Sequence, residues 1–255
     1  MVPVGVSFLR AVAPRLGGEQ ARAQAALIDA IAPIYAEILA VWRIDTALRV
    51  AHFTAQVAHE SAGFRAVEEF ASGEAYEGRL DLGNARAGDG RRYKGRGLIQ
   101  LTGRANYRRV GRVLGVDLEG QPTLAAQPVL GLRIACAFWD GRGLNRHADA
   151  DDLNAVTRGV NGGLNGLTDR HRYLLRAKAA LDCLAELDDV PLLRRGEHGS
   201  AVSTLQCLLR GKGASLAIDG AFGPATEAAV LAFQRNTGLA VDGIVGPRTW
   251  AALRG

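Results

Sequence analysis

Residues 48–63 read LRVAHFTAQVAHESAG and contain the helix on which the rest of the interpretation depends. Phe53, Glu60 and Phe64 are spaced so that they fall on one face of a helix. Gly63 is suited to end that helix, because glycine accepts the left-handed conformation found after a last helical turn. The stretch therefore predicts a helix over about 46–62 that carries a carboxylate on an apolar stripe, close to its C-terminal end.

The rest of the first 187 residues is predicted to be mainly helical. The apolar residues between 20 and 42 recur with a helical period. In contrast, residues 93–102 read YKGRGLIQLT, lack that period and contain two glycines, which predicts a small strand or β-hairpin. Further helices are expected near 105–114, 129–140, 152–159 and 168–187.

A short motif recurs near the C-terminus. DGAFGPAT at 219–226 returns as DGIVGPRT at 242–249, a spacing of 23 residues. Each copy places proline where a helix begins, a position at which its missing N–H is harmless. We expect three short helices at about 200–211, 225–237 and 247–254. Their core faces are expected to contain Leu205, Leu208, Leu209, Ala229, Val230 and Phe233.

A composition break separates this module from the rest of the chain. Residues 187–200 contain Pro191, Gly196 and Gly199 and no sustained helical period, which favours a linker or the entry loop of a second domain. The predicted domains are 1–187 and 188–255. The fold class is mainly α, with a helical first domain bearing a small hairpin and a small three-helix second domain.

Composition and charge narrow the classes of function. The 255 residues are 48% hydrophobic and 22% charged, which is ordinary for a globular protein. The formal charge of +5 and the sequence pI near 9.4 suit an anionic partner. No polybasic tail is present, so nucleic acid is not an expected partner. No apolar run approaches a membrane span, and no classical signal peptide is expected.

Three scattered cysteines, Cys136, Cys183 and Cys207, argue against a disulfide framework, and there is no CxxC pair. No metal site and no cofactor are predicted. The chain is expected to be made in a reducing cytosol and to be monomeric.

The carboxylate at position 60 is the first candidate for chemistry. An apolar surrounding and the negative end of the helix dipole would both raise the pKa of Glu60, as a general acid requires. The alternative is a structural ion pair with an arginine such as Arg96, and spacing alone leaves both open. A wetter acidic cluster follows, and one dry and one wet carboxylate is the pattern used in glycoside hydrolysis. That cluster contains Glu68, Glu69, Glu74 and Glu77.

Two resemblances extend this interpretation. DGAFGPATEAAVLAFQ and VDGIVGPRTW resemble the type 1 peptidoglycan-binding module. His59-Glu60-Ser61, YKGRGLIQLT, Asn106-Tyr107 and VTRGVNGG at 156–163 resemble the family 19 chitinase-like glycoside hydrolases, and specifically their phage endolysin branch. The second resemblance spans about 45–175 and implies a lysozyme-like helical catalytic domain.

The family 19 resemblance also implies roles for individual residues. Glu60 would be the general acid and Glu69, nine residues on, the general base, although the adjacent Glu68 leaves the choice of base open. Thr102 would help to hold the attacking water. The residues expected to contact the sugar or shape the cleft are Tyr93, Arg96, Gln100, Asn106 and Asn161, with Arg96 also an expected ion-pair partner.

The resemblances imply a substrate and a setting. Together they point to inverting, muramidase-type hydrolysis of β-1,4 bonds in bacterial peptidoglycan by an endolysin. The enzyme would be made in the host cytoplasm, released by a holin-type partner and active on the wall in the periplasm. The bond cleaved, on the muramic or the glucosamine side, stays open, and so do the host and a phage or prophage origin.

Other functions were weighed against this one. Chitin is an alternative substrate, and a non-catalytic wall-binding protein is an alternative class. His59-Glu60 begins an HExxH zinc motif, but position 63 is Gly, so the second histidine ligand is missing. A cysteine peptidase needs an activated, partly exposed thiol, whereas Cys136 lies in an apolar run.

Overall fold

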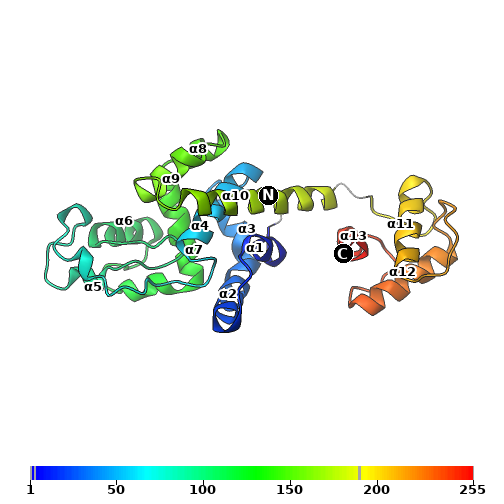
Figure 1. Ribbon diagram of the computed structural model, residues 1–255, viewed down its shortest axis with the longest axis horizontal. Helices are drawn as coiled ribbons and strands as arrows, with labels where there is room; N and C mark the ends of the chain where they lie inside the picture. The colour runs from blue at the N-terminus through cyan, green and yellow to red at the C-terminus, as the bar shows by residue number, and fades with distance from the viewer. Residues whose placement is uncertain (1, 3, 189–190, 255) are drawn as a thin grey trace. The chain divides into compact units, whose positions relative to one another are not determined.

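The computed structural model describes residues 2, 4–188 and 191–254, and these form two compact units, Met1–Leu181 and Asp182–Gly255 (Figure 1). Both are helical, as the sequence predicted. The α-helices of the first unit and its edge are α1 (Val6–Val12), α2 (Gly18–Ile31), α3 (Tyr35–Val41), α4 (Ala47–Glu60), α5 (Asp89–Arg92), α6 (Arg104–Leu114), α7 (Pro128–Gly141), α8 (Asn145–Asp149), α9 (Leu153–Asn161) and α10 (Leu167–Asp188). Short 3-10 turns occupy Ala32–Ile34, Glu74–Tyr76, Leu80–Leu82 and Pro122–Ala126. The second unit contains α11 (Ser200–Gly211), α12 (Pro224–Thr237) and α13 (Pro247–Arg254).

The predicted single helix over 20–42 is wrong in one respect. Pro33 turns the chain into a 3-10 segment at Ala32–Ile34, so that α2 and α3 are separate helices. Proline lacks the N–H that would continue the helical ladder and clashes with the preceding turn. The sequence shows one continuous helical period across the break because both helices direct their apolar residues toward the same core.

Helix α4 forms the centre of the first unit. The side chain of Thr46 caps it by accepting a hydrogen bond from the amide of Arg49 at 3.3 Å. Every residue from Val50 to Ala58 is buried, because α4 packs against α1, α8 and α9. This burial fixes the end of α4, and therefore the side chain of Glu60, relative to the surrounding helices.

The predicted hairpin is reduced to a single pair of residues. Arg96 and Leu101 exchange both backbone hydrogen bonds, at 3.2 and 2.8 Å, around a four-residue loop that contains Gly97 and Gln100 with positive φ. A second bridge joins Glu68 to Arg96. The described residues therefore hold the segment after Tyr93 as a bridged loop and not as an extended strand.

The segment Gly18–Val41 passes a length and composition test for a membrane span, with a mean hydropathy of 1.5. This differs from the sequence-based expectation, which considered only uninterrupted apolar runs. In the structure the segment is broken at Pro33, and Ile28, Ile31 and Tyr35 lie in the core of the unit. An amphipathic core helix passes the same test, so these properties alone do not identify a span.

The second unit is built around the predicted apolar faces. Leu205, Leu209, Val230 and Phe233 are buried in its core, while Leu208 and Ala229 are partly buried against it. The entry segment belongs to this core from Pro191 onward. Leu193 is buried and exchanges backbone hydrogen bonds with Val245 at 3.1 and 2.8 Å.

Each DGxxGPxT turn of the second unit encloses a buried glutamine. The Nε2 group of Gln206 donates to Asp219, to the carbonyl of Ala221 and to Thr226, and its Oε1 accepts the amides of Asp219 and Gly220.

In the second copy, Gln234 makes the same five bonds to Asp242, Gly243, Ile244 and Thr249. The repeated motif is therefore the shell of a repeated hydrogen-bond network.

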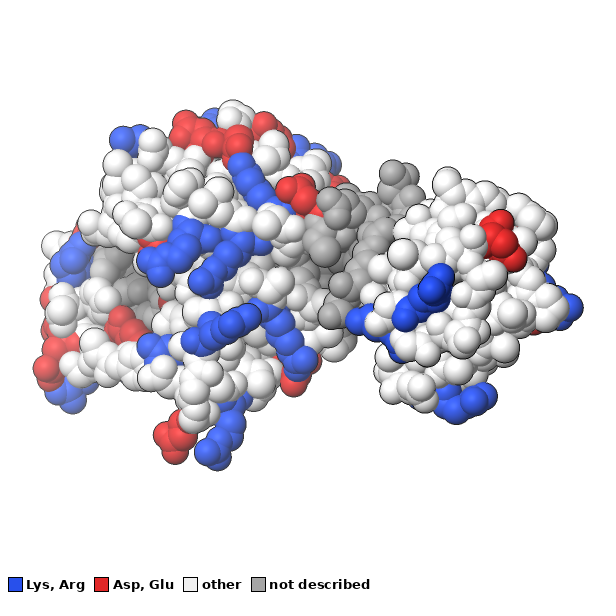
Figure 2. All heavy atoms as spheres, turned by 45° about the vertical axis from the view of Figure 1, so that its right-hand side comes forward, with Lys and Arg blue, Asp and Glu red and all other residues white. Residues whose placement is uncertain are grey.

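Charged side chains are mixed on the surface of the first unit. On the face shown in Figure 2, Lys and Arg gather toward the middle while most Asp and Glu lie nearer the edge. This face of the first unit is therefore locally basic, while the sequence has no polybasic tail.

Candidate active site

The chain reverses sharply where α4 ends. The hydroxyl of Ser61 donates to the carbonyl of Val57 at 2.7 Å and accepts the amide of Phe64 at 3.1 Å. Gly63 has φ +79°, and a Cβ there would lie 2.6 Å from a carbon of Pro14. The stop predicted at Gly63 is thus a steric requirement as well as a conformational one. It leaves Glu60 as the last residue of the helix.

The carboxylate of Glu60 is paired with a buried arginine. Nη2 of Arg170, on α10, donates to Oε1 of Glu60 at 2.6 Å. The side chain of Arg170 is 2% exposed and that of Glu60 is 19% exposed. The alternative interpretation, a structural ion pair at Glu60, is therefore correct about the interaction, but the arginine is Arg170 and not Arg96. The site around Glu60 is less apolar than the stripe on α4 suggested.

Arg170 is held by more than this pair. Its Nη1 donates to Oε1 of Gln56, one turn before Glu60, and its Nε donates to the carbonyl of Asn165 at 3.2 Å. Gln56 in turn donates to Thr157 of α9. The end of α4 is therefore tied to α9 and to the start of α10 through side chains that are buried together.

His59 makes a second tie to α10. Its Nδ1 lies 2.8 Å from Oδ2 of Asp169. A Cβ at Gly166, which has φ +73°, would lie 2.4 Å from the Nε2 of that ring. His59 thus packs against the turn before α10.

Glu69 lies in the loop that follows α4 and is held differently. Tyr76 donates to its Oε2 at 3.0 Å, while its Oε1 is buried without a hydrogen-bond partner. Burial, and then the bond to Glu69, raise the pKa of Tyr76, so that the phenol remains a donor at neutral pH. One carboxylate oxygen is thus oriented, and the other is buried without a partner.

Gly95 brings Glu69 close to Gln100. The amide of Glu69 donates to the carbonyl of Gly95 at 3.0 Å. A Cβ at position 95 would lie 3.0 Å from Oε2 of Glu69 and 2.8 Å from Oε1 of Gln100. Glycine is therefore needed where a carboxylate and a side-chain amide converge from different parts of the loop region.

The neighbouring carboxylate, Glu68, is occupied by cations. Its Oε1 lies 3.1 Å from Lys94 and 3.2 Å from Arg96. Burial alone would raise its pKa, but the two cations outweigh that effect and lower the pKa of Glu68. No ion pair to Glu69 is present among the residues that the structure describes. The two adjacent glutamates therefore have different roles available to them.

Thr102 and Asn106 join Gln100 in one chain of hydrogen bonds. Thr102 donates to the carbonyl of Gln100 at 2.9 Å, and Asn106 donates to the carbonyl of Thr102 at 2.8 Å. Gln100 has φ +52° and donates to the carbonyl of Gly97. All three side chains are partly exposed, and the group meets Glu69 through Gln100 at Gly95.

Three of the predicted site residues are placed apart from this group. Tyr93 is buried and donates to the carbonyl of Glu119. Arg96 is 6% exposed and donates to Arg92 and Tyr107 besides its pair with Glu68. Asn161 is exposed as the last residue of α9. Tyr93 and Arg96 thus support the loop from within, and neither presents its polar end to the surface near Glu69.

Sequence reasoning missed Gln56, Tyr76 and Arg170. Gln56 had a visible signal, because it lies one turn before Glu60 on the same face of α4. Tyr76 lies in an irregular loop, and Arg170 is 110 residues from its partner, so neither carried a local signal. Among the described residues no group of three or more His, Cys, Asp or Glu is placed to hold a metal ion. Cys136 is buried and Cys207 exposed, both as free thiols, and the side chain of Cys183 lies outside the described part.

Comparison with family models assigns the two regions. Residues 42–152 match the chitinase class I model of glycoside hydrolase family 19, and residues 198–253 match the putative peptidoglycan-binding domain model. The chain therefore carries a family 19 chitinase-like region followed by a peptidoglycan-binding domain, as the two resemblances indicated.

Similar curated proteins and solved structures agree with the first region. A glycosyl hydrolase family 19 domain-containing protein of Haemophilus influenzae is 38% identical over 114 residues, which cover 45% of this chain and 54% of that protein. An acidic endochitinase of Solanum chilense is 38% identical over 100 residues, 37% of this chain and 36% of that protein. The chain thus spans about half or less of the length of these relatives. The crystal structure of a family 19, class IV chitinase from Zea mays matches with a TM-score of 0.52 at 22% identity, covering 71% of this chain and 94% of that one, which establishes the fold.

Proposed function

We propose that this chain, a family 19 chitinase-like region joined to a peptidoglycan-binding domain, hydrolyses β-1,4 glycosidic bonds in the glycan strands of bacterial peptidoglycan. The observation that carries the proposal is that three glutamates within ten residues of the sequence have unlike partners. Glu60 is paired with a buried arginine, Glu68 with two cations, and Glu69 with a phenol alone. Two carboxylates in unlike surroundings are what glycoside hydrolysis needs.

Glu60 is assigned the role of general acid. It gives its proton to the leaving glycosidic oxygen as the C1–O bond breaks, and it becomes a carboxylate as it does so. Nη2 of Arg170 lies 2.6 Å from that carboxylate and favours the charge that develops. Since Arg170 also donates to Gln56 and Asn165, its position does not depend on the protonation of Glu60.

Glu69 is assigned the role of general base. Its carboxylate accepts a proton from water while the water oxygen attacks C1 from the opposite face, which inverts the anomeric configuration. Tyr76 orients the carboxylate through Oε2. Gln100, which meets Glu69 at Gly95, is assigned to the sugar, and Thr102, which donates to the carbonyl of Gln100, to the water. Asn106 and Asn161 are assigned to further sugar contacts.

Substitution of the two acids tests this assignment. Glu60→Gln and Glu69→Gln should each lower the rate of turbidity loss of permeabilised bacterial cells by about 10²- to 10⁴-fold, while sedimentation with purified walls is unchanged. Glu37→Gln, at an exposed position on α3, is the matched control. Lysis by Glu60→Gln within threefold of the unsubstituted protein would remove Glu60 from the acid role and would favour a wall-binding protein without catalysis.

The choice of base and the stereochemistry have their own tests. Glu68→Gln should lower activity less than Glu69→Gln does, because Glu68 already neutralises Lys94 and Arg96. Nuclear magnetic resonance of fresh product should show the α-anomer first. An initial β-anomer would contradict direct attack by water.

Chitin is the second candidate substrate, favoured by the endochitinase names of similar proteins. Both glycans contain β-1,4-linked N-acetylglucosamine, and the C-terminal domain favours the wall. Mass spectrometry of muropeptides identifies the new reducing end and so the bond cleaved, which we propose is the muramidase-type bond. Faster turnover of chitin oligomers than of wall glycan would reverse the choice.

The biological setting that we propose is host cell lysis by an endolysin. The monomeric protein would reach the periplasmic wall with the aid of a holin-type partner. Expression in bacteria with and without a membrane-permeabilising holin tests this, since lysis should require both proteins. Lysis by the chain alone would contradict the need for a partner.

A further inference from the structure

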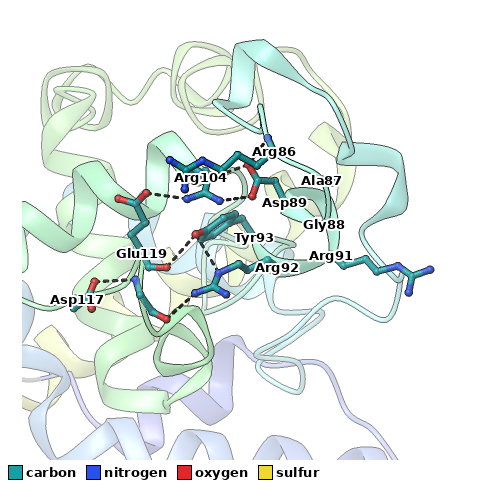
Figure 3. A pocket seen from close by; sticks show the side chains of 11 residues that line it. Arg86, Ala87, Gly88, Asp89, Arg91, Arg92, Tyr93, Arg104, Asp117 and Glu119 are labelled. Atoms are coloured by element: carbon teal, nitrogen blue, oxygen red, sulfur yellow. Dashed lines mark hydrogen bonds and ion pairs between the residues drawn. The ribbon is translucent and has the colours of Figure 1, made fainter.

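The first unit contains an open pocket of about 850 Å³ that is not used in the mechanism above. Its walls come from the loop before α5, from α5, from the start of α6 and from the turn at 117–120 (Figure 3). Tyr93 lies in the middle of these side chains. The guanidinium of Arg104 is 4.7 Å from the centre of its ring, and that of Arg92 is 5.7 Å from it.

Part of this wall is internally neutralised. Arg104 is paired with Asp89 and lies 3.1 Å from Glu119. Glu119 also pairs with Arg108 at 2.7 Å. Arg104 and, to a smaller extent, Arg86 lower the pKa of Asp89, and Arg108 and Arg104 lower the pKa of Glu119 to about 2, so both carboxylates stay ionised. These two carboxylates and the arginines Arg104 and Arg108 neutralise one another, so they offer no unpaired charge to a ligand.

Two other arginines keep their charge. Arg92 donates only to neutral oxygens, the Tyr93 hydroxyl at 3.2 Å and the Gly120 carbonyl at 2.9 Å. The guanidinium of Arg86 is exposed and has no hydrogen bond or ion pair among the described residues. Arg91, in contrast, is paired with Glu74 and extends away from the other side chains in Figure 3. The pocket therefore presents two unneutralised guanidinium groups.

One acidic side chain is also left over. The carboxylate of Asp117 accepts the amide of Gly120 at 2.8 Å and has no cationic partner among the described residues. A ligand that matches the pocket carries carboxylates for Arg86 and Arg92 and an ammonium group for Asp117. A neutral sugar satisfies none of these groups. A polyphosphate has no cation for Asp117 and is repelled by that unpaired carboxylate.

We propose that this pocket binds the carboxylate-bearing stem peptide of peptidoglycan, which chitin lacks. The substrate named here rests on the proposed function. A guanidinium group can bind a carboxylate through two parallel hydrogen bonds, whereas an ammonium group acts as a single point of charge. The pocket also adjoins the catalytic loop, because Tyr93 belongs to it and Gly95, two residues on, contacts Glu69. Occupancy of both sites selects a glycan strand that carries peptide.

Binding of an isolated peptide tests the pocket without any hydrolysis. The probe is the N-acetylated tetrapeptide L-Ala-D-Glu-diaminopimelate-D-Ala, titrated calorimetrically into the full chain. Arg86→Ala should weaken its binding about tenfold, and Arg86→Lys about threefold, because lysine keeps the charge and loses the forked geometry. Arg22→Ala, at an exposed position on α2, is the control and should leave the affinity unchanged.

The chemistry of the ligand is tested with altered probes. The same peptide with its carboxyl groups amidated should not bind, and inorganic phosphate should not displace the peptide at equal concentration. Equal binding of the amidated peptide, displacement by phosphate, or an affinity unaltered by Arg86→Ala would each overturn the proposal. The last outcome would assign peptide binding to another part of the chain.

Kinetics separate this proposal from the proposed function. Arg86→Ala should raise KM about tenfold for peptide-bearing wall fragments with kcat unchanged, and should leave cleavage of an N-acetylglucosamine oligomer unaffected. A chain that binds the peptide through Arg86 and cleaves only chitin would contradict the proposed function and leave the pocket assignment standing. If the chain cleaves the wall equally well with and without Arg86, the pocket assignment is contradicted and the proposed function stands.

Discussion

Gln206 and Gln234 reach side-chain and carbonyl partners that lie 8 to 20 residues away in the sequence, whereas Gln56 and Arg170 reach partners more than 100 residues away. Both sets are buried hydrogen-bond networks at the centre of a helical unit. The first forms when one turn folds onto one helix. The second exists only after α4, α9 and α10 have packed together.

The two units therefore hold their buried hydrogen-bond networks by different physical means. A local network returns wherever its motif returns, which is why the C-terminal unit contains it twice. A long-range network needs the rest of the unit to hold its members, because the cost of closing the long loops is met by packing elsewhere. The carboxylate of Glu60 is therefore positioned by the whole first unit and not by its own sequence neighbourhood.

The largest expected effect follows from removing one of the local centres. Gln234→Leu leaves the amides of Asp242 and Gly243 and the carbonyl of Ile244 without their buried partner, and Gln206→Leu does the same in the other copy. Each should lower the free energy of unfolding of the C-terminal unit by about 4 kcal/mol. Hydrogen exchange of the full chain, resolved by peptide, measures this for each unit separately.

The control for these variants is Gln121→Leu, at an exposed position of the first unit. It should change stability by less than about 0.5 kcal/mol. Protection lost equally in both units, or a loss in neither, would show that the glutamines do not act as local centres.

The range of these interactions also explains what the sequence could predict. The three helices of the C-terminal unit and four of the ten buried core residues that the structure describes there were predicted, because DGxxGPxT turns and apolar periodicity are local signals. Helices α6, α7, α9 and α10 of the first unit were predicted within one or two residues for the same reason, whereas the short helix α8 was missed. The break at Pro33 could have been predicted as well, since proline inside a helical pattern is itself a local signal.

The candidate site was predictable only in part. Motifs suggested Glu60, Glu69 and the group around Gln100, and the structure brings Glu69 and Gln100 together at Gly95, with Thr102 and Asn106 bonded to the segment that follows Gln100. The partners that tune the two carboxylates were not found. The sequence pattern of the helix that contains Arg170 does not predict a contact with Glu60, and Tyr76 lies in a loop without periodicity.

Breaking the long-range network is expected to have the next largest effect. Arg170→Met leaves Glu60 and Gln56 without the guanidinium that joins them. We expect a loss of about 2 kcal/mol in stability, less than for a fully buried pair because Glu60 is partly exposed, and a fall of at least tenfold in kcat. Thermal unfolding and steady-state hydrolysis of wall glycan measure the two quantities.

Arg65→Met is the control for this variant, since Arg65 donates to one backbone carbonyl near its own position. Full activity in Arg170→Met would show that Glu60 needs no guanidinium. A loss of stability with unchanged kcat would confine Arg170 to a structural role.

A smaller effect is expected from the phenol on Glu69. Tyr76→Phe removes one hydrogen bond, at 3.0 Å, to the carboxylate and leaves the packing of the ring in place. We expect kcat to fall about fivefold to tenfold, with stability changed by less than about 1 kcal/mol. Equal kcat in the two proteins would mean that Gly95 and the backbone alone orient Glu69. Tyr107→Phe is not a matched control, because that hydroxyl also joins Arg96 and Lys94.

The smallest expected effect is a difference in how the two units respond to acid. His52, buried in α4, lies 2.7 Å from Asp151, which also binds Lys178. Burial outweighs the nearby carboxylates of Asp151 and Asp152 and lowers the pKa of His52. Below about pH 6.5 the unfolded chain therefore binds a proton that the folded unit resists, and the stability of the first unit falls with pH.

The second unit should respond only at lower pH. Backbone and glutamine donors lower the pKa of Asp219 and Asp242, so their contribution is present above their ordinary value of 3.8 and is lost as pH falls through it. Peptide-resolved hydrogen exchange at pH 7.5 and 5.0, corrected for the intrinsic rate, should therefore show loss of protection in the first unit alone. His52→Gln should remove that loss. Equal losses in both units would show that the buried imidazole of His52 is not what makes the first unit less stable in acid.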